Sequence, residues 1–462
     1  MRTRWTRGAA LLALAAIMAA GCGSSSRKGS DNATGSSTTA APAKATTFGD
    51  IDSPCGAGDA KGATDKGVTD TEITIGYGDD AGYQASPGLN HEMSDAMKAM
   101  IQWCNDQGGI NGRQVKGNYY DGKITEVNNV ITQACSDAVF MLVGEGFALD
   151  AAQEQIRLGC KLPAMPTYAV SPEFANGPLM YAAVPNPVDY QPVTEAAYYA
   201  SKFPDKAKKM GTMFANFPAT QDTKDKQNST WPKVGVTHLS CQLEYNIVGE
   251  ADWKPFVKKL QDCGAEAVSF VGSPYPNFEN FLEAADQLQY HPDYLLQANF
   301  YDAQLGKWNA KGLADDIYVR LQDIPFEYAS TNKATQDYLD IMAKQGGDTS
   351  DLGIHATSAF LLWATAVKSC GSTVTRDCVL KYASTQHDWS GGGLSGKADV
   401  GKNLPSDCEV VVSLTGTKWE QVYPDKGGEL GCDPKNVQKA SGNVVDKVQM
   451  GPDRIVHKFE AP

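Results

Sequence analysis

The sequence predicts an α/β fold made of two lobes, each built around a parallel sheet. The chain has 462 residues, which is more than a single hydrophobic core usually serves. From Val68 onward, short apolar strands alternate with amphipathic helices, and a second alternating series starts near Lys208. Strands separated by helices are typical of right-handed crossovers and therefore of parallel sheets. Two such lobes in one chain indicate a cleft between them.

The first series covers residues 72–168, and its first helix places Met93, Met97, Ile101 and Cys104 near one face. Strands are expected at 72–78, 114–121, 138–146 and 162–168, with helices at 89–107, 125–137 and 150–161. In the second series, strands are expected at 208–216, 233–241, 266–272 and 293–300, with helices at 252–264 and 277–288. A strand pair is expected at 408–416 and 418–424.

The first 21 residues have the pattern of a secretory signal. Arg2, Arg4 and Arg7 precede an apolar run of about a dozen residues, which is shorter than the roughly 20 that a membrane-spanning helix requires. Small residues directly before Cys22 resemble the lipobox of bacterial lipoproteins, in which the thiol is acylated and the chain is cut before it. The alternative is an ordinary signal peptide with a chance cysteine.

Residues 22–67 are then expected to form a lipid anchor and a flexible tether. The part at 24–47 is rich in Ser, Thr, Gly and Ala and has few side chains large enough to pack. An acylated cysteine would hold the protein on a membrane surface. We therefore expect an extracytoplasmic protein that is lipid-anchored to the outer face of the cytoplasmic membrane.

Composition and motifs argue against several function classes. A net charge of −13 disfavours nucleic-acid binding, which uses a basic face, but leaves a small ligand open. The six histidines form no HExxH, and the cysteines form no CxxC, so no metal and no cofactor is expected. The stretch GYGDDAG has the spacing GxGxxxG rather than that of a dinucleotide loop, and no GxSxG or P-loop occurs. The sequence therefore predicts that the protein is not an enzyme.

Several stretches together resemble one family. GVTDTEITIGYGDDAG, CNDQGGINGRQVKGNYYDGK and AVFMLVGEG, followed by DWKPFVKKLQDCGAEAVSFVG, are similar to the type I periplasmic binding proteins of the branched-chain amino-acid-binding (leucine-binding) family, in a lipoprotein form as in actinobacteria. The resemblance covers residues 68–424. It implies two Rossmann-like lobes that close by a hinge over a small molecule, which the permease of an ABC transporter then accepts, and it implies a monomer.

The resemblance also implies that the chain crosses the hinge three times, near Gln191, Val319 and Leu394. One lobe is then expected at 68–190 plus 320–394, and the other at 191–319 plus 395–435. The tail at 436–462 has no pattern that predicts its structure. The expected role is substrate binding for an ABC importer. The alternative is a ligand-sensing receptor lipoprotein that signals to a membrane partner.

Ligands of open α/β sheets bind outside the carboxyl ends of the strands, so the loops there supply the candidate binding residues. For any single loop residue, solvation or local packing is the alternative role. In the first lobe the candidates are Asp79, Asp80, Tyr83, Glu145, Gly146, Phe147, Ala148, Thr167, Tyr168 and Ala169. In the second lobe they are Asn216, Phe217, Ser273, Tyr275, Asn299, Phe300 and Tyr301.

The candidate site departs from its family at three positions. Relatives that bind aliphatic amino acids hold the carboxylate with Ser and Thr hydroxyls and the ammonium with a Glu, and these positions align with Ala148, Val170 and Asn299 here. We therefore expect the amino-acid anchor to be lost. Five aromatic candidates predict a flatter or more apolar ligand instead, namely Phe147, Tyr168, Tyr275, Phe300 and Tyr301. Alternatively, the candidate carboxylates Asp79, Asp80 and Glu145 would select an amine or amide.

Ten cysteines remain besides Cys22, an even number that suits five disulfides in an oxidising compartment. The expected order of strands and helices places their partners at shared sheet edges, and each bond would add about 2–4 kcal/mol of stability. Reactive thiols are the alternative, although no cysteine has an evident histidine base nearby. The expected pairs are Cys55 with Cys104, Cys135 with Cys160, Cys370 with Cys378, Cys408 with Cys432 and, as the remainder, Cys241 with Cys263.

Overall fold

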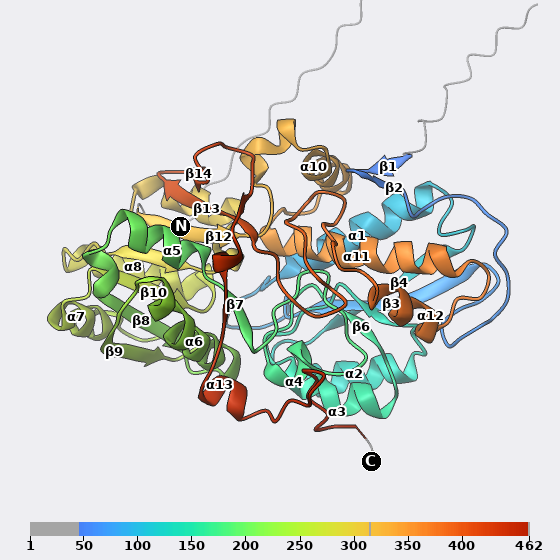
Figure 1. Ribbon diagram of the computed structural model, residues 1–462, viewed down its shortest axis with the longest axis horizontal. Coiled ribbons are helices and arrows are strands. Elements are labelled where there is room, and N and C mark those ends of the chain that lie inside the picture. The colour runs from blue at the N-terminus through green and yellow to red at the C-terminus, as the bar shows by residue number, and fades with distance from the viewer. Residues whose placement is uncertain (1–45, 314–315, 461–462) are drawn as a thin grey trace, which may run out of the picture. The chain divides into compact units, whose positions relative to one another are not determined.

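The computed structural model describes residues 46–313 and 316–460 (Figure 1). The expected signal segment, the lipidated Cys22 and the tether as far as residue 45 lie outside the described residues. Across the described part of the chain, no helix combines the length and the apolar character needed to span a bilayer.

Lobe I contains a four-stranded parallel sheet with the order β4-β3-β5-β6. The helices α1 and α11 pack on one face of this sheet, and α2 and α3 pack on the other (Figure 1). The strands are β3 (Glu72–Asp79), β4 (Gln114–Asp121), β5 (Leu142–Val143) and β6 (Ala164–Met165). The helices are α1 (His91–Asp106), α2 (Val127–Ser136), α3 (Ala151–Gly159), α4 (Pro172–Ala175), α10 (Lys333–Gln345), α11 (Asp351–Cys370) and α12 (Arg376–Ala383).

Lobe II contains a larger sheet with the order β14-β13-β12-β11-β10-β8-β9. Five of its strands are parallel, and the expected pair β13 and β14 adds an antiparallel edge. The strands are β8 (Met210–Ala215), β9 (His238–Tyr245), β10 (Ala267–Val271), β11 (Asp293–Leu296), β12 (Ile317–Leu321), β13 (Cys408–Thr415), β14 (Lys418–Tyr423) and β15 (Gly431–Cys432). The helices are α5 (Thr194–Lys202), α6 (Pro218–Thr230), α7 (Lys254–Cys263), α8 (Glu279–Gln287) and α9 (Ala303–Trp308).

The first helix shows how the sequence pattern produces the packing. In α1 the side chains of Met93, Met97, Met100 and Cys104 recur every three or four residues and are all buried, as an amphipathic helix requires. The strand β3 supplies Ile73 and the alternating residues that follow it to the same core. The expected α/β fold with parallel sheets is therefore confirmed.

Both sheets begin with the same strand order. In each lobe the first strand in the chain lies between the second and the third, so the connections after the first and third strands leave on opposite faces of the sheet. This arrangement opens a crevice at the carboxyl ends of β3 and β5, and another at those of β8 and β10. Ligands of open α/β sheets bind at such switch points.

We place the first crossing between the lobes at the strand β7 (Tyr190–Pro192), which contains Gln191. Val319 lies inside β12, so the second crossing follows Leu321 instead, because the lobe II sheet continues to that residue. It runs beside the third crossing, where the backbone N–H of Ile324 donates to the carbonyl of Leu394 at 3.0 Å.

The C-terminal tail adds a fourth crossing. The strand β16 (Val437–Lys439) pairs antiparallel with β7, and α13 (Asn443–Asp446) follows it. Beyond α13, the guanidinium of Arg454 donates to both oxygens of the buried Asp189 carboxylate, at 2.7 and 2.8 Å. Three tail valines, Val444, Val448 and Val456, pack around Val188.

The described part of the expected tether, residues 46–67, differs from the prediction because it packs against lobe I. The strands β1 (Thr47–Phe48) and β2 (Ile51–Asp52) pair with each other, and Phe48 is fully buried. A disulfide then joins Cys55 to Cys104 at the end of α1. Hydrogen bonds add to these contacts, because the backbone N–H of Asp50 donates to the carbonyl of Gly392 at 2.9 Å and the ammonium of Lys368 donates to the carbonyl of Ser53 at 2.7 Å.

The five expected disulfide pairs are the pairs found in the structure. Each joins elements of a single lobe, so none of the five bonds links lobe I to lobe II. They are Cys55–Cys104, Cys135–Cys160, Cys241–Cys263, Cys370–Cys378 and Cys408–Cys432.

The contact between Arg454 and Asp189 predicts that two cationic residues of the tail contribute differently to stability. Replacing Arg454 by Ala leaves the buried Asp189 carboxylate without its partner, so we expect the free energy of unfolding to fall by about 1–3 kcal/mol in urea titrations. Lys458, whose side chain is 59% exposed and pairs with Glu173 at 3.6 Å, is the control, and Lys458→Ala should change it by less than about 0.5 kcal/mol. Equal effects of the two variants would contradict the assignment.

Candidate functional site

A cavity of about 280 Å³ lies between the two lobes. Its walls combine aliphatic and aromatic side chains with uncharged polar groups, and four charged residues lie near the crossing segments. The lining residues up to the end of the first crossing are Tyr83, Ser86, Leu89, Asn90, Ile124, Ala148, Thr167, Tyr168, Val170, Val184, Pro185, Asn186, Gln191 and Pro192. The remainder are Phe217, Ala219, Thr220, Thr223, Lys226, Ile247, Val271, Gly272, Ser273, Gln297, Ala298, Asn299, Arg320, Gln322, Asp351, Leu352 and His355.

The switch points of both sheets supply the expected part of this lining. Seven of the seventeen candidate residues line the cavity, and they come from loops at the carboxyl ends of the strands. Val170, which was compared with the family anchor positions, lines it as well. The seven are Tyr83, Ala148, Thr167, Tyr168, Phe217, Ser273 and Asn299.

The candidate carboxylates Asp79 and Asp80 do not line the cavity. Both are fully buried, and Asp80 accepts backbone N–H bonds from Ile124 at 2.6 Å and Ala148 at 2.7 Å. Burial raises the pKa of Asp80 to about 6 despite these bonds. Asp79 accepts a bond from the hydroxyl of Tyr119 at 2.6 Å. These carboxylates hold loops in place, and through Ile124 and Ala148 the Asp80 carboxylate shapes the cavity wall.

The other lobe I candidates that miss the cavity are packed inside the lobe. Phe147 and Ala169 are each 1% exposed, and Gly146 lies against Tyr168. Glu145 is fully buried, and neither of its carboxylate oxygens has a hydrogen-bond partner. The loop that contains Glu145, Gly146 and Phe147 turns at Gly144, where φ is +72° and an added Cβ would overlap the Met97 side chain, so glycine is required there.

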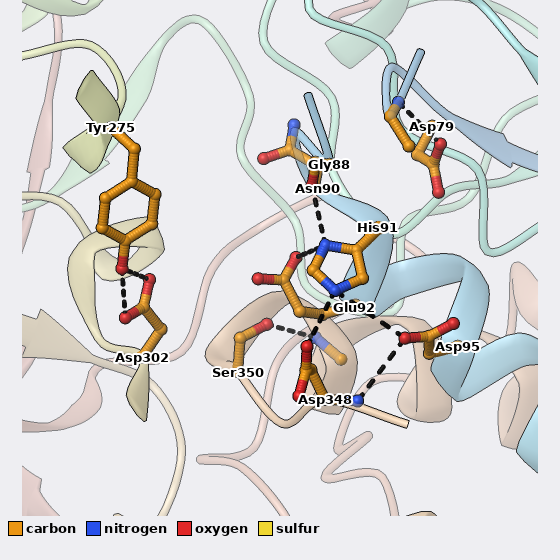
Figure 2. Close-up of polar contacts among 12 residues, drawn as sticks. Asp79, Gly88, Asn90, His91, Glu92, Asp95, Tyr275, Asp302, Asp348 and Ser350 are labelled. Atoms are coloured by element: carbon orange, nitrogen blue, oxygen red, sulfur yellow. Dashed lines mark hydrogen bonds and ion pairs between the residues drawn. The ribbon is translucent and has the colours of Figure 1, made fainter. Parts of the chain in front are cut away.

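The lobe II candidates that miss the cavity have internal partners. Figure 2 shows the hydroxyl of Tyr275 directed at the carboxylate of Asp302. The side chain of Asn216 accepts a bond from the backbone of Ile247 at 2.9 Å and so supports a residue of the lining. Phe300 and Tyr301 are buried in the lobe II core. Of the five aromatic residues from which the ligand class was predicted, only Tyr168 therefore lines the cavity, and the other aromatic rings of the lining are those of Tyr83 and Phe217.

A polar cluster surrounds the start of α1 (Figure 2). The imidazole of His91 bonds to the carbonyl of Gly88 at 2.7 Å and to the carboxylate of Asp348 at 3.0 Å. Burial raises the pKa of the adjacent Glu92 carboxyl to about 7. These residues connect α1 to the segment before α11. They do not line the cavity themselves, whereas the neighbouring residue Asn90 does.

The charged residues of the lining were not among the sequence candidates. Arg320 forms ion pairs with Glu409 at 2.8 Å and with Glu195 at 3.5 Å, both buried. Lys226 lies on α6 and is 8% exposed. The sequence of this helix, PATQDTKDKQNST, has no apolar stripe. A buried face without apolar residues indicates polar surroundings, and this pattern could have pointed to α6 as part of a binding site.

Asp323, Asp351 and His355 form a compact buried group beside the cavity. The His355 Nε2 atom lies 3.1 Å from Asp323 and 3.4 Å from Asp351. Burial opposes the charged imidazole, but the two carboxylates raise the pKa of His355. No metal is expected from the sequence, yet among residues 46–313 and 316–460 this group alone brings three potential metal-ligand atoms within 4.8 Å of one another. Here the three side chains form an ion-paired triad.

Comparisons with known proteins agree on the fold. The chain matches the family described as periplasmic binding protein over residues 72–413. No curated protein sequence matches this chain. A fatty-acid ABC transporter substrate-binding protein from Thermomonospora curvata is 14% identical with a TM-score of 0.66, covering 83% of this chain and 97% of that one.

Two other solved structures share the fold at similar identity. A branched-chain amino-acid transporter substrate-binding protein from Streptococcus pneumoniae, in complex with isoleucine, is 15% identical with a TM-score of 0.61, covering 77% of this chain and 100% of that one. An extracellular ligand-binding receptor from Rhodopseudomonas palustris is 17% identical with a TM-score of 0.63, covering 76% and 99%. Identities of this size show the fold alone.

The burial of Glu145 predicts a pH dependence of stability. Burial is the main reason that its pKa is raised to about 8, with Arg157 lowering it and Glu154 raising it. Because the folded pKa is above the ordinary value of 4.5, the folded state binds the proton more tightly than the unfolded state, and this stabilisation is lost as the pH rises from about 4.5 to about 8.

Glu145→Gln removes the carboxyl group whose ionisation causes this loss of stability at high pH. In urea titrations we expect the variant to be more stable than the parent by about 1–3 kcal/mol at pH 8 and nearly equal to it at pH 5. Glu266→Gln, at an exposed position paired with Lys209, is the control and should change stability by less than about 0.5 kcal/mol at either pH. A variant that is less stable than the parent at pH 8 would contradict the prediction.

Proposed function

Since the chain belongs to the periplasmic binding protein family, we propose that it is the substrate-binding protein of an ABC importer and captures an apolar or aromatic small molecule between its two lobes. The family is extracytoplasmic and consists of binding proteins rather than enzymes. We further propose that the mature chain is a monomer, held by an acylated Cys22 on the outer face of the cytoplasmic membrane, where it delivers its ligand to a permease.

The apolar lining that both lobes contribute is the observation that carries this proposal. Ile124 and Tyr168 come from lobe I, and Phe217, Ile247 and Val271 come from lobe II. Burying one such side chain against a ligand contributes about 1.5–3 kcal/mol, and aromatic rings add favourable stacking geometry. A ligand that contacts both walls stabilises the closed arrangement, which is the shape a permease reads.

The three departures from the amino-acid-binding relatives support a different ligand. Ala148, Val170 and Asn299 all line the cavity, so the family anchor positions face the ligand space here as well. The first two have no hydroxyl to donate to a carboxylate. The third offers an amide, whose N–H already bonds to the carbonyl of Gly272 at 3.0 Å, rather than a carboxylate for an ammonium group. The loss of the amino-acid anchor therefore fits the observed lining.

Contacts between the lobes support the proposed closure. The hydroxyl of Ser86 donates to the carbonyl of Tyr275 at 3.2 Å, and Ile124 of lobe I packs into the core of lobe II. The relative from Thermomonospora curvata is named for fatty-acid transport and the one from Streptococcus pneumoniae was solved with isoleucine. Of these two ligand classes, the apolar lining fits the first better.

A thermal-shift screen of the chain from residue 23 tests the ligand class. We expect aromatic or long-chain apolar compounds to raise the melting temperature, since a ligand at 100 times its dissociation constant stabilises by about 2.7 kcal/mol. Leucine, isoleucine and valine should give no shift. Stabilisation by these amino acids alone would show that the anchor is not lost.

Two adjacent residues provide a matched pair of variants. Ile247 lines the cavity, whereas its neighbour Val248 is 57% exposed and does not. We expect Ile247→Ala to weaken the binding of an apolar hit from the screen roughly 10-fold and Val248→Ala to leave it unchanged, as measured by isothermal titration calorimetry. Equal effects of the two variants would place the ligand outside this cavity.

A further inference from the structure

Three cationic side chains line the cavity near the crossing segments, and two of them are neutralised by the protein itself. Arg320 forms ion pairs with Glu195 and Glu409. His355 forms ion pairs with Asp323 and Asp351. The third, Lys226, has no carboxylate within ion-pairing distance anywhere in the described part of the chain.

The ammonium of Lys226 bonds only to neutral acceptors. It donates to the side-chain carbonyl of Asn186 at 3.0 Å and to the backbone carbonyl of Pro187 at 2.9 Å. A lysine ammonium has three donors, so a third is left for the cavity that this residue lines. Thr220 and Thr223 precede it on the same face of α6 and line the cavity too.

Nearby carboxylates that would ordinarily pair with Lys226 are bound elsewhere. Asp222 lies one turn before it on α6, at the spacing that favours a helical ion pair, but it pairs with Lys447 of the tail. Asp189 pairs with Arg454, also of the tail. The C-terminal tail therefore occupies both carboxylates and leaves the amine without a counter-ion.

The environment makes this amine costly to keep charged in the absence of an anion. Burial, and next the positive charge of Arg320, lower the pKa of Lys226 to about 7, while Asp189 and Asp222 raise it more weakly. Polar residues that destabilise the folded protein in this way are typical of binding sites. An anionic group in the cavity would supply the missing charge.

We propose that Lys226 is the recognition site for an anionic oxygen of the ligand, so that the ligand class is an apolar organic acid, with its apolar part against the aliphatic and aromatic walls. This inference rests on the proposed binding function and specifies its substrate. Because Lys226 belongs to lobe II and bonds to Asn186, in the segment of lobe I that leads into β7, an anion bound there also strengthens the contact that holds the lobes closed.

Ligands that share a tail and differ in charge test this proposal. Octanoate, octan-1-ol and octylamine, with their C4 to C12 homologues, are titrated into the chain from residue 23, which contains every described residue. We expect the best acid to bind at least roughly 10-fold more tightly than the alcohol of equal length, and the amine to bind more weakly still. An alcohol that binds as well as its acid overturns the inference, and so does a series in which no acid binds.

Variants separate charge recognition from a structural role of the amine. Lys226→Met should abolish the preference for acid over alcohol while retaining binding of the alcohol, and Lys226→Arg should keep the preference. Lys224→Met is the control, because Lys224 lies on the same helix, pairs with Asp225 at 3.0 Å and does not line the cavity. A preference that survives in Lys226→Met overturns the proposal.

A measurement without ligand gives an independent test. Because the unpaired ammonium costs stability, Lys226→Met should raise the melting temperature of the ligand-free protein by roughly 2 °C, whereas Lys224→Met should not raise it. A lower melting temperature for Lys226→Met would show that the amine is retained for its bonds to Asn186 and Pro187. Should neutral apolar compounds bind while acids do not, the binding function stands and only this inference fails.

Discussion

The order of the parallel strands is the constraint on which the rest of this molecule depends. In both lobes the first strand lies between the second and third, so the chain leaves the sheet on opposite faces at one place and cannot fill the space between. The cavity residues Tyr83, Ala148, Phe217 and Ser273 all follow the strands that border these two crevices. The position of the site is thus a property of the topology and does not depend on any particular ligand.

Topology fixes where the loops lie, whereas buried polar groups fix how they are shaped. Asp80 bonds to the backbone of two residues that line the cavity, and the side chain of Asn216 does the same for Ile247. A carboxylate used in this way is satisfied inside the lobe and has little capacity left for a ligand. Asp79 and Glu145 are buried as well, and none of the three carboxylates lines the cavity, so the observed lining gives no support to the alternative that they select an amine or amide.

The sequence predicted most of the strands, the two parallel sheets and the five disulfides because each depends on local periodicity or on the topology that follows from it, and seven of its candidate residues line the cavity for the same reason. It could not tell which side chains of a loop point inward, since Phe147 and Tyr168 stand in equivalent loops and only the second lines the cavity. Nor could it place Lys226, whose importance arises from contacts with residues up to 40 positions away.

The cationic side chains near the crossings differ in whether the protein supplies their counter-ions. A buried cation can be neutralised by the protein, as Arg320 is, or kept for a ligand, and the difference depends on where the neighbouring carboxylates are engaged. Here the C-terminal tail, which the family resemblance does not cover, pairs with Asp189 and Asp222. Lys226 is thereby left without a carboxylate partner. A segment outside the two lobes can in this way set the ligand chemistry of a cavity between them, although the fold of the lobes is shared with proteins that bind other molecules.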